Sequence, residues 1–207
     1  MEHRYVAEKF WKESNNYPKY HPSGMLKRRL CEINYIIPKL VGNSILDLGC
    51  GDGTLLNCLL QLTDIAKYYA YDYSENLLSN LHPEIETKIF NCYTDDLSSL
   101  PDVDITITSG MFQYIFEDEK VSEILRNIKS PSLFLRIPCT TKRESEYINT
   151  YSEALNSRYA SVYRTVTGVL DLLSEEYVIE SVDRIWPDDI ESTFDTKQYY
   201  FVAKRIT

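Results

Sequence analysis

The residues with the clearest chemical potential form the glycine-rich segment DLGCGDG at positions 47–53, which lies between an apolar run and a leucine-rich run. Glycine allows the backbone to pass close to a ligand and to adopt positive φ. Free N–H groups at the start of a following helix would face the same ligand and favour a carboxylate or phosphate. The segment therefore predicts a loop between a strand and a helix that binds an anionic or zwitterionic molecule.

The spacing of the glycines distinguishes between ligand classes. A dinucleotide site uses the pattern G-x-G-x-x-G, whose third glycine would fall at position 54. That position is Thr54, the third glycine is Gly53, and Asp47 stands two positions before the first glycine, where the dinucleotide pattern has no acidic residue. An S-adenosylmethionine site fits better, and a dinucleotide site or a tight turn without a ligand are the alternatives.

The segment 45–54 resembles motif I of the class I S-adenosylmethionine-dependent methyltransferases. The resemblance covers residues 24–138 well and residues 176–206 in outline. Three later segments resemble the second motif, the adenine-flanking segment, and the fourth strand with its following loop: 71–74, 95–101 and 102–115. The resemblance implies an enzyme that uses S-adenosylmethionine and releases S-adenosylhomocysteine.

The resemblance also implies roles for residues at matching positions. The methionine moiety would lie against Asp47, Gly49, Cys50 and Gly51. Asp72 would accept hydrogen bonds from the ribose hydroxyls, and Tyr73 would pack on the adenine. The adenine would be flanked by Asp95, Asp96 and Leu97, and the sulfonium would lie over Ser109 and Met111. The alternatives are a helix-capping or solvated carboxylate for Asp72 and a polar turn at 95–96.

The methyl acceptor is less well defined. Enzymes that methylate amino groups of nucleobases and glutamine resemble one another in an Asn/Asp-Pro-Pro-aromatic turn, but residues 109–112 read SGMF. Cys139 follows Pro138 at the end of a strand, as does the cysteine nucleophile of enzymes that methylate C5 of pyrimidines. We favour the interpretation that Cys139 is a cysteine in the loop after the strand, without a catalytic role. We expect transfer to a small molecule, on a hydroxyl of a sugar or another metabolite. The alternatives are a non-catalytic module that binds S-adenosylmethionine or S-adenosylhomocysteine, and an N-methyltransferase acting on a small amine or a protein.

Two tyrosine-rich segments, 1–22 and 139–163, are where this family builds its acceptor pocket and lid. His21 is the candidate general base, with a solvated loop histidine as the alternative. Arg136 lies in an apolar strand and needs either a core carboxylate or an anionic acceptor as its partner. The candidate substrate-binding residues are Tyr17, Tyr114, Arg136, Tyr159 and Tyr163.

Strand and helix patterns alternate along most of the chain. They predict an α/β fold, a Rossmann-like doubly wound and mostly parallel seven-stranded sheet with an antiparallel C-terminal strand and helices on both faces. Strands are expected at 44–48, 67–73, 87–93, 104–109, 132–138, 176–186 and 198–205. Helices are expected at 3–13, 25–37, 54–62, 117–129 and 165–173, with a short one after Ser74.

We expect one methyltransferase domain over residues 1–207. Its parts would be an N-terminal helical lid or cap, an S-adenosylmethionine-binding core, an acceptor-side helical insertion and a C-terminal β-hairpin, at 1–43, 44–138, 139–175 and 176–207.

The composition narrows the range of partners. A net charge of −9 disfavours nucleic acid, and the only basic triplet, at 27–29, is expected to form a solvated helix face. The 5 cysteines include no C-x-x-C pair, so neither a metal site nor a disulfide framework is expected. No apolar run approaches the ~20 residues of a membrane span. We therefore expect a cytoplasmic protein, monomeric or homodimeric, that binds no membrane.

Overall fold

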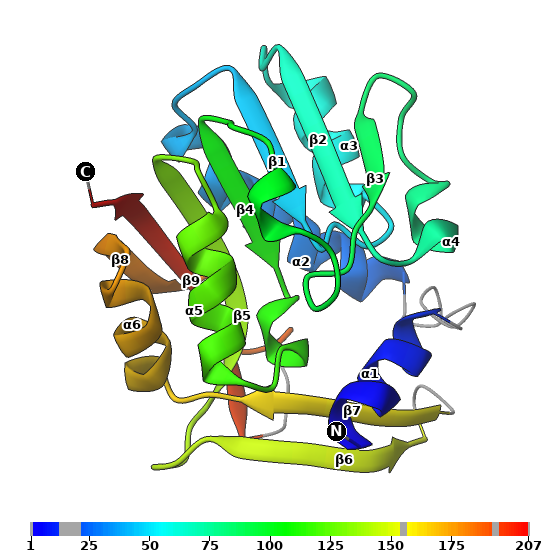
Figure 1. The fold of residues 1–207 in the computed structure, drawn as a ribbon, viewed down its shortest axis with the longest axis vertical. Helices are drawn as coiled ribbons and strands as arrows, with labels where there is room; N and C mark the ends of the chain where they lie inside the picture. The colour runs from blue at the N-terminus through cyan, green and yellow to red at the C-terminus, as the bar shows by residue number, and fades with distance from the viewer. Residues whose placement is uncertain (1, 13–21, 154–156, 192–194, 207) are drawn as a thin grey trace.

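The computed structural model describes residues 2–12, 22–153, 157–191 and 195–206, and its centre is a seven-stranded sheet (Figure 1). The strand order is β3-β2-β1-β4-β5-β9-β8. The first five of these strands run parallel, and β9 is antiparallel to both of its neighbours, which confirms the predicted fold class. The strands are β1 (Ser44–Leu48), β2 (Lys67–Asp72), β3 (Glu86–Ile89), β4 (Ile105–Ser109), β5 (Ser132–Thr140), β8 (Tyr177–Arg184) and β9 (Thr196–Arg205).

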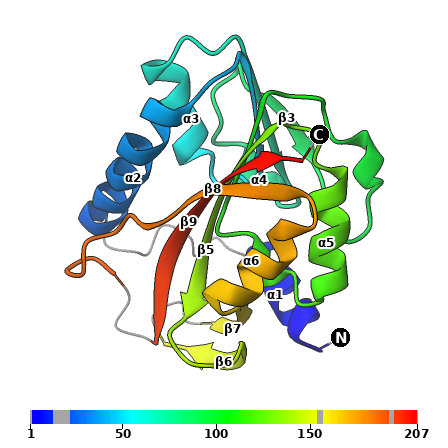
Figure 2. The same ribbon diagram turned by 90° about the vertical axis from the view of Figure 1, so that its left-hand side faces the viewer.

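Helices cover both faces of the sheet (Figure 2). One layer holds α2 (Pro22–Ile36) and α3 (Thr54–Leu62), and the other holds α5 (Asp118–Asn127) and α6 (Val166–Ser174). Successive side chains of a strand point to opposite faces, so Ile45 of β1 packs with the first layer and Leu46 with the second. The short helical elements are α4 (Glu75–Leu78), η2 (Ile37–Lys39), η3 (Leu97–Ser99) and η4 (Phe112–Tyr114). Among the described residues, no helix combines the length and apolar character that crossing a bilayer requires.

The sheet has one point where the direction of strand order reverses. β1 pairs with β2 on one side and with β4 on the other, both in parallel register. The loops that leave the carboxyl ends of β1 and β4 therefore turn to opposite faces and leave a crevice between them. The glycine-rich segment lies at this crevice, where the Gly49 N–H donates to the carbonyl oxygen of Tyr71 at 2.7 Å.

The predicted helical insertion at 139–175 is wrong in its first part. It contains β6 (Glu146–Ser152) and β7 (Ser157–Tyr163), which pair as a separate antiparallel sheet. Tyrosines and β-branched residues favour strands, and three successive residues of β7, Ala160, Ser161 and Val162, are buried. α1 (Glu2–Lys12) packs on β7, and both lie at the carboxyl end of the main sheet (Figure 1).

Candidate functional site

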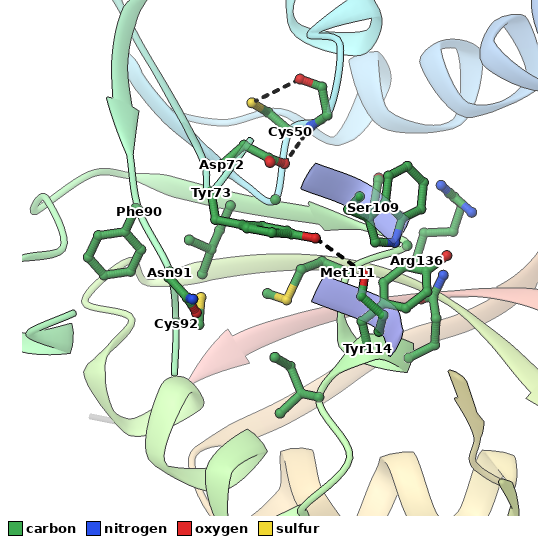
Figure 3. A pocket seen from close by; sticks show the side chains of 18 of the residues that line it. Cys50, Asp72, Tyr73, Phe90, Asn91, Cys92, Ser109, Met111, Tyr114 and Arg136 are labelled. Atoms are coloured by element: carbon green, nitrogen blue, oxygen red, sulfur yellow. Dashed lines mark hydrogen bonds between the residues drawn. The ribbon is translucent and has the colours of Figure 1, made fainter. Parts of the chain in front are cut away.

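A cavity of about 260 Å³ opens at the carboxyl ends of the parallel strands. Its walls come from the loops after β1, β2, β3 and β4, from α1 and α2, and from Arg136 in the middle of β5. In Figure 3, Phe90 and Cys92 lie at one end and Arg136 at the other, with Asp72 and Tyr73 between them. The predicted cofactor residues that line the cavity are Gly49, Cys50, Gly51, Asp72, Tyr73, Ser109 and Met111.

The glycine loop needs glycine at its first position for two reasons. Gly49 has a φ of 77°, in the left-handed region that side chains disfavour. A Cβ atom on Gly49 would also lie 2.5 Å from Cγ of Met111, across the cavity wall. The loop therefore keeps its backbone open to the cavity at the place where a ligand is expected.

Asp72 joins the loops that follow β1 and β2. Its Oδ2 accepts from the Gly51 N–H at 2.9 Å and its Oδ1 from the Ser74 N–H at 2.9 Å. Burial raises the pKa of Asp72, and these backbone hydrogen bonds act in the opposite direction. Each carboxylate oxygen has a second lone pair, so Asp72 can organise the loops and still accept from a ligand hydroxyl.

The aromatic ring of Tyr73 projects across the middle of the cavity in Figure 3. Its hydroxyl donates to the carbonyl oxygen of Glu8 at 3.0 Å, which ties α1 to the end of β2. The sequence analysis expected the segment 1–22 at the pocket but did not identify Glu8 or Trp11, because neither carries a motif that connects α1 to a site more than sixty residues later.

Asp47 does not itself line the cavity, but it directly precedes Leu48 and Gly49, which do, and it is only 1% exposed. Its Oδ1 is buried and has no hydrogen-bond partner among the described residues. Burial raises the pKa of Asp47 to about 7; Glu32 and Asp72 add to this effect and Arg29 opposes it. A buried carboxyl oxygen without a partner fits an incoming cationic donor such as the ammonium group of a methionine moiety. The residues present therefore fit S-adenosylmethionine.

We expect the affinity for S-adenosylhomocysteine to fall by about tenfold between pH 8 and pH 6, because the Asp47 carboxyl takes up a proton as the pH drops through about 7. The neutral carboxyl no longer attracts the ligand's ammonium group. Calorimetric titrations across this range measure the effect, and Asp47→Asn should remove most of the pH dependence. An unchanged pH profile in that variant would contradict the assignment.

A buried ion network lies at the other end of the cavity and was not predicted. Glu32 of α2 is 1% exposed and accepts from Arg29 Nη1 at 2.8 Å, from Arg136 Nε at 3.1 Å and from the Ser109 hydroxyl. Burial acts to raise the pKa of Glu32, but Arg136, Arg29 and the Ser109 hydroxyl together lower it. Glu32 is therefore a charged structural anchor rather than a general base, and it is the core carboxylate that Arg136 requires.

The interpretation of the basic triplet as a solvated helix face is wrong for two of its three residues. Lys27 is exposed and pairs with Asp189 at 2.5 Å, whereas Arg28 and Arg29 line the cavity. Residues one apart on a helix point in different directions, and the packing of α2 turns this side toward the sheet's carboxyl end. The available signal was a basic triplet in an acidic chain, on the long helix that precedes the first strand.

The three residues expected beside adenine do not line the cavity. Asp95 accepts from the Asn91 N–H at 2.9 Å, and Asp96 caps η3 by accepting from the Ser98 N–H at 3.0 Å, as a polar turn would. Leu97 is buried in the core. The residues that line this part of the cavity are Phe90, Asn91, Cys92 and Tyr93.

The candidate substrate residues divide into three groups. Tyr114 and Arg136 line the cavity. Tyr159 and Tyr163 lie behind it, where the Tyr159 hydroxyl is 3.3 Å from that of Tyr114 and 3.4 Å from that of Tyr163. Tyr17 and His21 lie outside the described residues, so the structure does not test the predicted base.

Cys139, the alternative nucleophile, does not line the cavity. It is fully buried in β5, and burial raises the pKa of its thiol to about 12. Two further residues that sequence reasoning missed do line the cavity, Gln113 of η4 and Trp186 after β8. No cluster of metal-ligating side chains occurs within the part of the chain that the structure describes.

Several solved structures of similar fold are methyltransferases. The chain resembles a magnesium protoporphyrin IX methyltransferase from Synechocystis (TM-score 0.67, 14% identity, 100% and 98% of the two chains covered) and an S-adenosylmethionine-dependent methyltransferase from Leishmania major (0.69, 15%, 97% and 82%). It also resembles the O-methyltransferase of a polyketide synthase multienzyme from Brevibacillus brevis (0.57, 14%, 88% and 71%). At these identities the similarity establishes the fold alone. No curated protein matches the chain significantly.

The sequence itself matches one family, described as a methyltransferase domain, over residues 46–131. This stretch runs from β1 to the end of the α5 segment and contains the glycine loop, Asp72 and Tyr73. Residues 46–131 therefore belong to a methyltransferase domain, and the chain around them has the fold of class I S-adenosylmethionine-dependent methyltransferases.

Proposed function

We propose that the chain transfers the methyl group of S-adenosylmethionine to a hydroxyl group of a small molecule. The observation that carries the proposal is the continuity of the cavity. It runs from the glycine loop past Met111 to an end lined by Tyr114, Arg136 and Trp186. An acceptor at that end would lie beside the cofactor and within a space suited to small molecules.

On this proposal, residues in different parts of the site bind different groups of the cofactor. Bound S-adenosylmethionine supplies a methyl group on a sulfonium, which is already a good leaving group. Asp47 holds the ammonium group, Asp72 the ribose hydroxyls, and Tyr73 packs on the adenine. Positioning the acceptor and excluding water supply much of the catalysis in such a reaction.

The segments that complete the acceptor end are proposed to be α1 and the β6–β7 hairpin. α1 contributes Trp11 to the cavity wall, and Tyr159 of β7 supports Tyr114 through its hydroxyl. These parts occupy the regions 1–43 and 139–175, which we propose to serve as lid and acceptor-side insertion of a single domain. A polyhydroxylated or aromatic acceptor suits tyrosine and tryptophan side chains.

A hydroxyl acceptor calls for a base, and no histidine lines the cavity within the described ranges. Glu32 is unsuitable because its arginine partners hold it in the charged, weakly basic state. His21 remains the proposed base. The resemblance in fold to an O-methyltransferase supports a hydroxyl acceptor without identifying it.

The test is transfer of radiolabelled methyl from S-adenosylmethionine to a panel of sugars, hydroxy acids and phenols. We expect acceptor-dependent label in a methyl ether that survives mild alkali, and a loss of about 10²-fold in rate for His21→Ala. Each acceptor with its hydroxyl already methylated is the matched control. Label on amines, or an alkali-labile ester, would contradict the proposal. Binding of S-adenosylhomocysteine without any transfer would indicate a non-catalytic module.

A further inference from the structure

We propose that the acceptor is an organic acid whose carboxylate binds between Arg28, Arg136 and the indole N–H of Trp186. The proposal rests on the proposed function, since it names the class of small molecule that occupies the acceptor end of the cavity. The acceptor end of the cavity has an excess of positive charge, although the net charge of the protein is −9.

The excess is visible in the pairing of the cavity's arginines. Arg29 and Arg136 share the single carboxylate of Glu32. Arg28 donates only to the carbonyl oxygen of Ile190, at 2.9 Å, and pairs with no carboxylate of the described residues. Arg29 and Arg136 also act on the buried carboxyl of Asp47, so three guanidinium groups lie near two buried carboxyls at this end, and Arg28 pairs with neither of them. An anionic ligand would relieve this imbalance more than a neutral one.

Two of these guanidinium groups lie against one aromatic ring. The guanidinium carbon of Arg28 is 5.0 Å from the ring centre of Trp186, and that of Arg136 is 5.3 Å from it. The ring holds both cationic groups at the same wall of the cavity, where each can donate to a planar, two-oxygen partner. Trp186 thereby brings together charges from α2 and β5, which are more than a hundred residues apart in sequence.

Hydrogen-bond donors remain unused on the same side chains. Arg136 donates from Nε to Glu32 and from Nη1 to Gln198, while its Nη2 donates to no described residue and lies near Gly110 of the cavity wall. The indole Nε1 of Trp186 is buried and has no partner among the described residues. Buried donors normally have an acceptor, and a carboxylate supplies several lone pairs at once.

The alternative ligand for these arginines is the carboxylate of the cofactor's methionine moiety. The positions of the arginines distinguish a site for that carboxylate from a site for the acceptor's carboxylate. Among the arginines, Arg29 has the largest electrostatic effect on Asp47, the proposed partner of the methionine ammonium group. Arg136 has a smaller effect on Asp47 than Arg29 has, and Arg28 lies against the ring of Trp186. We therefore assign Arg29 to the cofactor side and the Trp186 cluster to the acceptor.

The experiment is calorimetry on the protein saturated with S-adenosylhomocysteine, which reads binding without requiring turnover. The probes are matched acid and amide pairs of increasing size: glycolate and glycolamide, salicylate and salicylamide, 4-hydroxybenzoate and 4-hydroxybenzamide. We expect at least one acid to bind about tenfold or more tightly than its amide. Arg28→Gln should bring the two affinities to within about twofold while the affinity for S-adenosylhomocysteine stays unchanged.

Lys27→Gln is the matched control, because it makes the same change in charge at the neighbouring exposed position of α2. It should preserve the preference for the acid. Three outcomes would overturn the inference: no acid is preferred over its amide, both variants lose the preference equally, or Arg28→Gln weakens S-adenosylhomocysteine instead. Failure of the proposed hydroxyl transfer would appear separately, in the methyl-transfer assay, with the acid preference intact.

Discussion

Replacing Glu32 by alanine is expected to lower the free energy of unfolding by about 3–5 kcal/mol, the largest stability effect predicted for the site. The substitution leaves Arg29 and Arg136, which are only 12% and 11% exposed, without their shared carboxylate. Two neighbouring buried cations would then repel each other and lack a counter-charge. Equilibrium denaturation followed by circular dichroism measures the loss.

Glu123→Ala is the matched control for that measurement. Glu123 also forms an ion pair three residues apart on a helix, with Lys120 at 2.9 Å, but its side chain is 48% exposed. Exposed pairs of this kind contribute about 0–1 kcal/mol. Equal losses in the two variants would show that the buried network at Glu32 contributes no more than a surface pair.

Asp72→Ala is expected to weaken the binding of S-adenosylhomocysteine by about 1–3 kcal/mol. The variant loses the proposed acceptor for the ribose hydroxyls. It also leaves the Gly51 and Ser74 N–H groups without their acceptor, so the glycine loop loses its link to the end of β2. Calorimetric titration of S-adenosylhomocysteine provides the measurement.

Asp96→Ala decides between the adenine contact expected from sequence and the placement found in the structure. Asp96 is exposed, lies outside the cavity lining and hydrogen-bonds to Ser98 of η3. The structure predicts little change in ligand affinity for this variant. A loss comparable to that of Asp72→Ala would place Asp96 at the adenine after all.

The elements that sequence predicted accurately are those with a strong local pattern. The strand at 44–48 and the helix at 54–62 have the predicted bounds, because an apolar strand, a glycine loop and a leucine-rich helix each restrict the backbone locally. The segment 146–163 was misjudged because its tyrosines tolerate either state. The packing of Ala160 and Val162 against α1 and Phe116 favours a strand, and that contact is distant in sequence.

The residues of the site also divide into those that a local sequence pattern predicts and those that only tertiary contacts place. The glycine loop and Asp72 follow from sequence because a motif and its spacing place both at the carboxyl ends of adjacent parallel strands. The sequence thus determined the fold class, the cofactor class and the location of the cavity. The tertiary structure alone decided which side chains of α2 face inward, how Glu32 joins Arg29 to Arg136, and that Trp186 gathers two guanidinium groups. These contacts connect residues far apart along the chain, and burial and charge pairing between packed elements leave no periodic or local trace in the sequence.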